Sequence, residues 1–243
     1  MKIDIKPIFI GFYNIIKVFI RKNRDGNVME LDNIVDKKKL LVFDMDGTLL
    51  DSMELWRYLG RIYLESKSKK VEDNLEEVID CMTLEESASY FKSNYNLNED
   101  INVIEKEIIS FIENKYLNDI PLKKGVKEYL QELHQEGYKM CVLTTSEKKQ
   151  AISALRRTGI LDLFENVYTD KDFTMSKTNP QIYIKVCERM NEVPKNTVVF
   201  EDALYAIESA KKAHCTVIGV YDEYYKNDWN KIQSIADGII YNF

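Results

Sequence analysis

The chain has 243 residues, of which 45% are hydrophobic and 30% charged, and its formal net charge is -6. This composition is typical of a folded globular protein with a sizeable core, and the acidic balance disfavours nucleic acid as a partner. The 4 cysteines include no C-x-x-C pair, so a disulfide framework and a zinc site have no support and we expect a cytoplasmic protein.

The amino-terminal end carries an apolar stretch with basic flanks. Residues 7–20 are apolar except for Asn14 and Lys17, and the neighbouring charges are mostly basic. The stretch is too short to cross a bilayer, but membrane-surface contact of residues 7–24 is one alternative. The others are a segment docked on the domain and a start at Met29. Residues 1–38 are therefore treated as an extension whose role stays open.

Residues 40–43 predict a short buried strand that ends in the letters DMDGT. In an extended chain, residues i and i+2 share a side, so Asp44 and Asp46 can face one substrate atom at the edge where open α/β sheets bind ligands. The glycine permits a tight turn, and Thr48 offers a hydroxyl and an amide to an anion. Two carboxylates this close need a cation, and Mg2+ suits them. The motif alone is also typical of an ordinary strand end.

Residues 53–120 show only helical periodicity, and we expect them to form an inserted cap domain. Capping boxes are predicted ahead of two of its helices, Asp51 with Glu54 and Thr83 with Glu86. An insertion directly after the first strand would lie over the carboxyl ends of the strands, where it could close on a ligand.

From residue 122 onward, helical and strand patterns alternate with short turns, which is typical of a parallel sheet. The predicted strands cover residues 139–144, 167–169, 197–200, 216–220 and 238–240. The predicted helices cover residues 126–136, a segment capped by Ser146 and running to Thr158, residues 178–191 and residues 203–213. We predict an α/β protein whose Rossmann-like parallel-sheet core comprises residues 39–52 and 121–243.

Polar side chains of matched chemistry stand at four strand or loop ends. They are Asp44 with Asp46, Thr144, Lys177, and Glu201 with Asp202. A carboxylate nucleophile, a second carboxylate to carry a proton, a hydroxyl and an ammonium for phosphoryl oxygens, and acidic metal ligands together predict a phosphoryl-transfer site. Each residue alone also fits an ordinary role, such as a solvated lysine, a strand-end threonine or a helix cap.

The letters DMDGT at 44–48 and FED at 200–202 resemble the motifs of the haloacid dehalogenase-like hydrolase superfamily, in its β-phosphoglucomutase-like branch with a helical C1 cap. The resemblance covers residue 40 to the end of the chain. It implies that Asp44 attacks phosphorus and forms an aspartyl-phosphate. It also implies that Asp46 protonates the leaving oxygen and then activates water.

The resemblance further implies roles for the remaining polar residues. Thr144 and Lys177 would hold the phosphoryl oxygens. A Mg2+ cofactor would be held by the side chains of Asp44 and Asp202, the main-chain carbonyl of Asp46, and Glu201 through water or Lys177. Thr145 stands where the family often has Asn. His214 stands where Gly usually ends a helix, so we expect either a strained cap or a different turn.

The expected substrate is a small phosphorylated metabolite. Between residues 53 and 120 there are fifteen acidic and eight basic side chains, which disfavours polyanions. A sugar phosphate is the first choice and a nucleotide or cofactor monophosphate the second. Candidate substrate contacts are Thr48, Thr145, Arg57 and Thr83, although Arg57 also fits a solvated arginine and Thr83 a plain helix cap. We expect a monomer.

Two alternatives to a phosphatase stay open. A sugar phosphomutase would use the same nucleophile, but Thr48 and the lack of a mutase cap signature favour hydrolysis. A catalytically silent binding module is the second alternative, and the intact Asp44, Asp46, Lys177 and Asp202 argue against it. A P-loop kinase is excluded because no glycine is followed by lysine.

A chain that begins at Met29 is predicted to stay in solution and to be as active as the whole chain, because the predicted site lies after residue 40. Expression of both forms and one activity assay would check this. Aggregation or inactivity of the shorter chain would show that the amino-terminal segment belongs to the fold.

Overall fold

The computed structural model describes residues 34–35, 38–79 and 82–243. The predictions for residues 7–24 and for a start at Met29 lie outside these ranges. Within them, no helix combines the length and the apolarity that a bilayer crossing requires.

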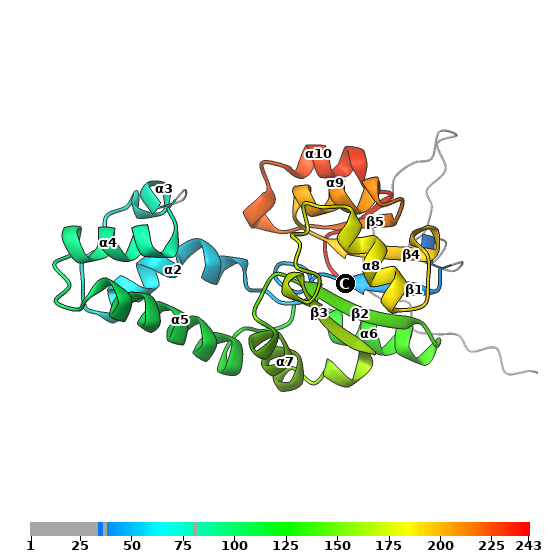
Figure 1. The fold of residues 1–243 in the computed structure, drawn as a ribbon, viewed down its shortest axis with the longest axis horizontal. Coiled ribbons are helices and arrows are strands. Elements are labelled where there is room, and N and C mark those ends of the chain that lie inside the picture. Colours follow the sequence, from blue (N-terminus) through cyan, green and yellow to red (C-terminus); the bar gives the residue numbers. More distant parts are fainter. Residues whose placement is uncertain (1–33, 36–37, 80–81) are drawn as a thin grey trace, which may run out of the picture.

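A six-stranded parallel sheet forms the centre of the fold (Figure 1). Its strands are β1 (Leu40–Phe43), β2 (Lys139–Thr144), β3 (Asn166–Thr169), β4 (Thr197–Glu201), β5 (Thr216–Val220) and β6 (Gly238–Ile240). Their spatial order is β3-β2-β1-β4-β5-β6, and every neighbouring pair is parallel. The predicted parallel sheet is confirmed. The strand order reverses at β1, and such switch points are where open α/β sheets bind ligands.

Helices cover both faces of the sheet. They are α6 (Val126–Gln135), α7 (Lys148–Arg157), α8 (Gln181–Arg189), α9 (Leu204–Lys212) and α10 (Trp229–Ile235). Short 3-10 turns are η1 (Leu161–Leu163), η2 (Asp170–Asp172), η3 (Pro194–Asn196) and η4 (Glu223–Tyr225). Alternate residues of β1 serve the two faces: Leu41 and Phe43 pack with α6 and α7, and Leu40 and Val42 pack with α8, α9 and α10. The result is a sheet buried between two helical layers.

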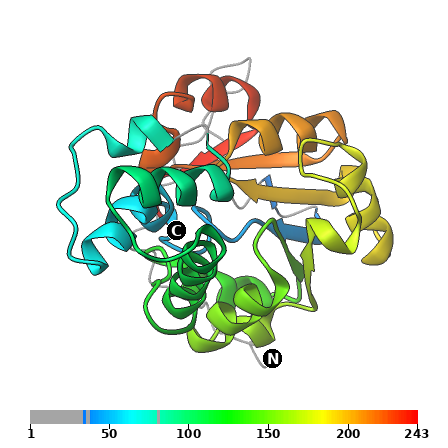
Figure 2. The ribbon, with the colours of Figure 1, turned by 60° about the vertical axis from the view of Figure 1, so that its left-hand side comes forward.

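Four further helices lie between β1 and α6, and we call residues 53–120 the cap. They are α2 (Met53–Ser66), α3 (Leu75–Ile79), α4 (Leu84–Asn94) and α5 (Ile101–Asn118). Figure 1 shows them gathered beyond one end of the sheet, and Figure 2 shows them in front of it when that end is turned forward. The predicted all-helical insertion is confirmed for residues 53–79 and 82–120, which the structure describes.

The two chain segments that join the cap to the sheet lie side by side. The amide of Asp51 donates to the carbonyl of Pro121 over 3.0 Å, and Leu50 forms a bridge with Leu122. The chain therefore leaves the sheet and returns to it through one paired connection.

Two predicted helix starts are wrong. The capping box of Asp51 with Glu54 is absent: α2 follows Ser52, which makes no cap hydrogen bond, and the Asp51 amide donates to the carbonyl of Pro121. Ser146 does not cap a helix either, since α7 begins after Glu147. Both serine hydroxyls instead donate to the side chain of Asp46. A serine hydroxyl can accept a hydrogen bond from a helix amide as an N-cap or donate one to a carboxylate, and these two serines donate to Asp46.

His214 ends α9 in the left-handed region, with φ of 64°. Its amide donates to the carbonyl of Lys211. The expected strained cap is thus present, and the other expectation, a different turn, is not needed.

The capping box of Thr83 with Glu86 is confirmed. The Thr83 hydroxyl accepts from the Glu86 amide over 3.2 Å, and the Glu86 carboxylate accepts from the Thr83 amide over 2.7 Å. We predict that Thr83→Ala lowers the free energy of unfolding by about 1 kcal/mol, because an amide at the start of α4 loses its acceptor. Urea unfolding would measure this, with Thr83→Ser as the control that keeps the hydroxyl. An unchanged midpoint in Thr83→Ala would contradict the prediction.

Candidate active site

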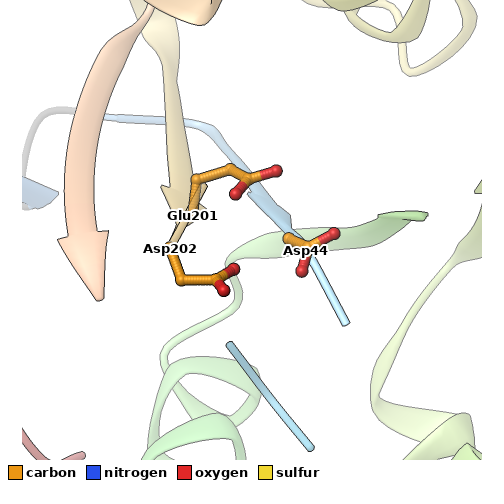
Figure 3. A group of neighbouring side chains, drawn as sticks. All are labelled: Asp44, Glu201 and Asp202. Carbon is orange, nitrogen blue, oxygen red and sulfur yellow. The ribbon is translucent and has the colours of Figure 1, made fainter. Parts of the chain in front are cut away.

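Three carboxylates meet where β1 and β4 end (Figure 3). Asp44 follows β1, Glu201 is the last residue of β4, and Asp202 comes next. The strands are neighbours with Phe43 paired to Phe200, so the residues that follow lie side by side. Oxygens of all three carboxylates lie within 4.8 Å of one another, and the three side chains are buried. Figure 3 shows the Asp202 carboxylate turned toward Asp44.

The ammonium of Lys177 enters this cluster from the loop before α8. It donates to Asp44 Oδ1 and, over 2.8 Å, to Glu201 Oε1. The other Glu201 oxygen accepts from the Ala203 amide over 2.9 Å. Lys177 is only 2% exposed, so the ion pairs are hardly screened by solvent. Glu201 therefore acts as a partner that fixes Lys177.

The cluster holds more negative than positive charge. Burial raises the pKa of Asp44 to about 8, against the lowering effect of Lys177, and Glu201 and Asp46 add to the rise. Burial also raises the pKa of Asp202 well above its ordinary value, with Glu201 and Asp44 contributing. Buried carboxylates in this state are stabilised by a further cation.

Asp202 offers a free ligand atom to such a cation. Its Oδ1 accepts from the Thr48 hydroxyl over 3.1 Å, whereas its buried Oδ2 has no hydrogen-bond partner among the residues that the structure describes. Gly47, with φ of 85°, keeps the adjacent space open, because a Cβ there would clash with Asp202 Oδ2. An unpaired carboxylate oxygen within an all-oxygen donor set fits a hard ion such as Mg2+.

Asp46 lies apart from the ion pairs, in a cage of three hydroxyls. Its Oδ1 accepts from Ser52 over 2.7 Å and from Tyr116 over 2.5 Å, and its Oδ2 accepts from Ser146 over 2.6 Å. The indole of Trp56 donates to the Tyr116 oxygen over 3.0 Å. Burial, with a contribution from Asp46, raises the pKa of Tyr116, so this phenol keeps its proton. Sequence reasoning missed these partners, since no local pattern marks them.

The structure places three of the four predicted threonines differently near the ends of β1 and β2. Thr48 is buried and holds Asp202. Thr144 is buried at the end of β2, where its hydroxyl accepts from the Ser146 amide over 3.0 Å. Thr145 is exposed beside it. Thr48 thus belongs to the carboxylate cluster, and Thr144 adjoins the cage of Asp46.

The two predicted cap residues are not joined to the cluster by any hydrogen bond or ion pair in the described part of the chain. Arg57 donates to the carbonyl of Glu223 over 3.2 Å, and its guanidinium lies 5.2 Å from the ring centre of Tyr224. It lines a cavity of about 470 Å³ between the start of α2 and the loop after β5. Thr83 is exposed and engaged in its capping box.

Comparisons with known proteins agree on one family. The family model described as haloacid dehalogenase-like hydrolase matches residues 41–220. A phosphorylated carbohydrates phosphatase of Thermotoga maritima is 27% identical over 173 residues, which cover 71% of this chain and 80% of that protein. A phosphoglycolate phosphatase of Vibrio vulnificus is 27% identical over 191 residues, which cover 75% of this chain and 83% of that protein.

Solved structures share the fold. A β-phosphoglucomutase candidate from Thermotoga maritima has a TM-score of 0.72 at 24% identity, over 83% of this chain and 94% of that one. The CbbY protein of Rhodobacter sphaeroides, in complex with xylulose-(1,5)bisphosphate, has a TM-score of 0.62 at 20% identity. The match covers 84% of this chain and 94% of that one.

We predict that Mg2+ stabilises the protein through Asp202. At a Mg2+ concentration ten times the dissociation constant, the ion should add about 1.4 kcal/mol to the free energy of unfolding and about 4 °C to Tm. Asp202→Asn should lose most of this gain.

The folded state raises the pKa of Asp202. The metal-free protein should therefore lose stability as the pH rises above the ordinary aspartate range, and the Asp202→Asn variant should lose less.

Thermal unfolding between pH 5 and 8, with Mg2+ or with a chelator, would measure both effects. The matched control is Asp162→Asn, which makes the same change at an exposed position. A full Mg2+ response in Asp202→Asn would exclude this carboxylate as a ligand.

Proposed function

The chain belongs to the haloacid dehalogenase-like hydrolase family, and from this we propose that it is a Mg2+-dependent phosphatase that cleaves a small phosphomonoester through an aspartyl-phosphate on Asp44. The observation that carries the proposal is the buried group of Asp44, Lys177, Glu201 and Asp202 at the switch point of the sheet. The names of the curated relatives, a phosphorylated carbohydrates phosphatase among them, support a phosphomonoester as the substrate.

In the first step, a carboxylate oxygen of Asp44 forms a bond to phosphorus while the bond from phosphorus to the leaving oxygen breaks. A proton from the carboxyl of Asp46 goes to the leaving oxygen. In the second step, Asp46 takes a proton from water, the water oxygen bonds to phosphorus, and the bond from Asp44 to phosphorus breaks. Asp44 is thereby regenerated, phosphate is released, and Asp46 is protonated again.

The charge of the substrate explains the neighbours of Asp44. A phosphate dianion is repelled by three buried carboxylates, and the ammonium of Lys177 offsets part of this repulsion. Mg2+, held by Asp44, Asp202 and the main-chain carbonyl of Asp46, would supply further neutralisation of the phosphoryl oxygens when bound. The hydroxyl of Thr144, which already accepts from an amide, keeps its own proton to donate to a phosphoryl oxygen.

The cap is proposed to select the substrate. Its excess of acidic residues disfavours polyanions, and a small sugar phosphate is the first choice. We propose Thr145 at the sheet edge as a substrate contact, together with Arg57 and Thr83 of the cap. Of the two cap residues, Arg57 has the more specific support, because it lines the cavity between the start of α2 and the loop after β5.

We predict that the protein releases phosphate from p-nitrophenyl phosphate with Mg2+ and that a chelator stops the reaction. Asp44→Asn should lower kcat/KM by about a thousandfold or more, because the amide is a poor nucleophile. Asp162→Asn should leave kcat/KM unchanged. Full turnover by Asp44→Asn would exclude the nucleophile.

The products of a sugar phosphate distinguish hydrolysis from phosphoryl transfer within the same family. A hydrolase releases inorganic phosphate in the same amount as free sugar. An isomeric sugar phosphate without free phosphate would instead identify a mutase.

A further inference from the structure

Tyr116 brings a buried hydroxyl from the cap to the acid–base residue of the sheet. It lies in the last turn of α5, is 0% exposed, and its hydroxyl contacts Asp46 Oδ1 over 2.5 Å. We propose that Tyr116 is a positioning residue that fixes the Asp46 carboxyl in the orientation from which it protonates the leaving oxygen. This inference rests on the proposed function and adds a residue to it.

Trp56 sets the direction of this hydrogen bond. An indole N–H can only donate, and that of Trp56 points to the Tyr116 oxygen over 3.0 Å. The phenol therefore accepts from Trp56 and has its own proton left for Asp46. A chain of donors that all point one way strengthens each member. The ring of Trp56 also lies edge-on to that of Tyr116, with centroids 6.4 Å apart, which supports the same arrangement.

Three hydroxyls restrain Asp46 from different sides. Ser52 and Tyr116 share Oδ1, and Ser146 holds Oδ2. Rotation of the carboxyl about either side-chain torsion would break at least one of these bonds. Tyr116 is the bulkiest and most rigid of the three donors, since its hydroxyl sits on a ring packed inside the protein.

The end of α5 that carries Tyr116 is tied to the sheet layer. Arg157 of α7 donates to the main-chain carbonyl of Tyr116 over 3.2 Å and to that of Ile120. The backbone of Tyr116 is thus held by the same part of the molecule that holds Asp46. The hydroxyl is consequently in place before substrate arrives, which is the condition for effective positioning.

The role predicts a dependence on the leaving group. A nitrophenolate departs with little help from an acid, a phenolate needs more, and a sugar alkoxide needs most. The quantity kcat/KM covers only the steps up to the departure of this group. Tyr116→Phe keeps the ring and removes the hydroxyl. We expect it to lower kcat/KM by about 10- to 100-fold for glycerol phosphate, and by less than about 3-fold for p-nitrophenyl phosphate.

The experiment measures kcat/KM for p-nitrophenyl, phenyl and glycerol phosphate in the wild type and in three variants with Mg2+ present. Tyr63→Phe is the matched control, because Tyr63 is also a buried cap tyrosine whose hydroxyl donates to a carboxylate, that of Glu107, over 2.6 Å. Tyr63→Phe should leave the dependence of kcat/KM on the leaving group unchanged. Trp56→Phe should make this dependence steeper, as Tyr116→Phe does, but to a smaller extent.

The outcomes separate this inference from the proposed function. A wild type that hydrolyses all three esters, with a steeper leaving-group dependence in Tyr116→Phe, supports both. An equal fall for all three esters, or no fall, would overturn the positioning role while the phosphatase stands. If Tyr116→Phe does not fold, an unchanged dependence in Trp56→Phe overturns the role. A wild type inactive toward every ester overturns the function and this inference with it.

Discussion

The buried contact of the Lys177 ammonium with Asp44 and Glu201 is the constraint on which the rest of the site depends. Charges this far from solvent cost several kcal/mol each unless they are paired, so their positions cannot vary much. The parallel neighbours β1 and β4 supply those positions through their register. Among the residues that the structure describes, the arrangement leaves Asp202 Oδ2 unpaired, and this excess of buried negative charge suits a cation.

The fold and the charged centre could be predicted from the sequence because both have local signals. Short apolar runs followed by acidic residues predicted β1 and β4. The acidic residues lie close together because the carboxyl ends of parallel strands meet at one edge of the sheet. The predicted family resemblance is confirmed by the family model. The roles of the individual site residues stay predictions, as do those of Arg57 and Thr83.

The surroundings of Asp46 could not be predicted in the same way. Ser52 and Ser146 stand where helix caps are common, and a sequence does not reveal whether a hydroxyl will bind an amide or a carboxylate. Tyr116 lies 70 positions from Asp46 along the chain, so their contact appears only when α5 returns to the sheet. Long-range polar contacts of this kind depend on packing, which periodicity does not encode.

The paired connection of Asp51 with Pro121, and of Leu50 with Leu122, has a consequence for how the length of the cap can vary. An insertion whose two ends already touch can lengthen, shorten or be exchanged without straining the strands beside it, since closing its loop adds little entropy. If the cap selects the substrate, as we propose, substrate choice could change by replacement of the cap alone, while the residues at the ends of β1 and β4 stay the same. Under the proposed role of Tyr116, a new cap would also have to supply a donor for Asp46, because that hydroxyl comes from α5 of the cap.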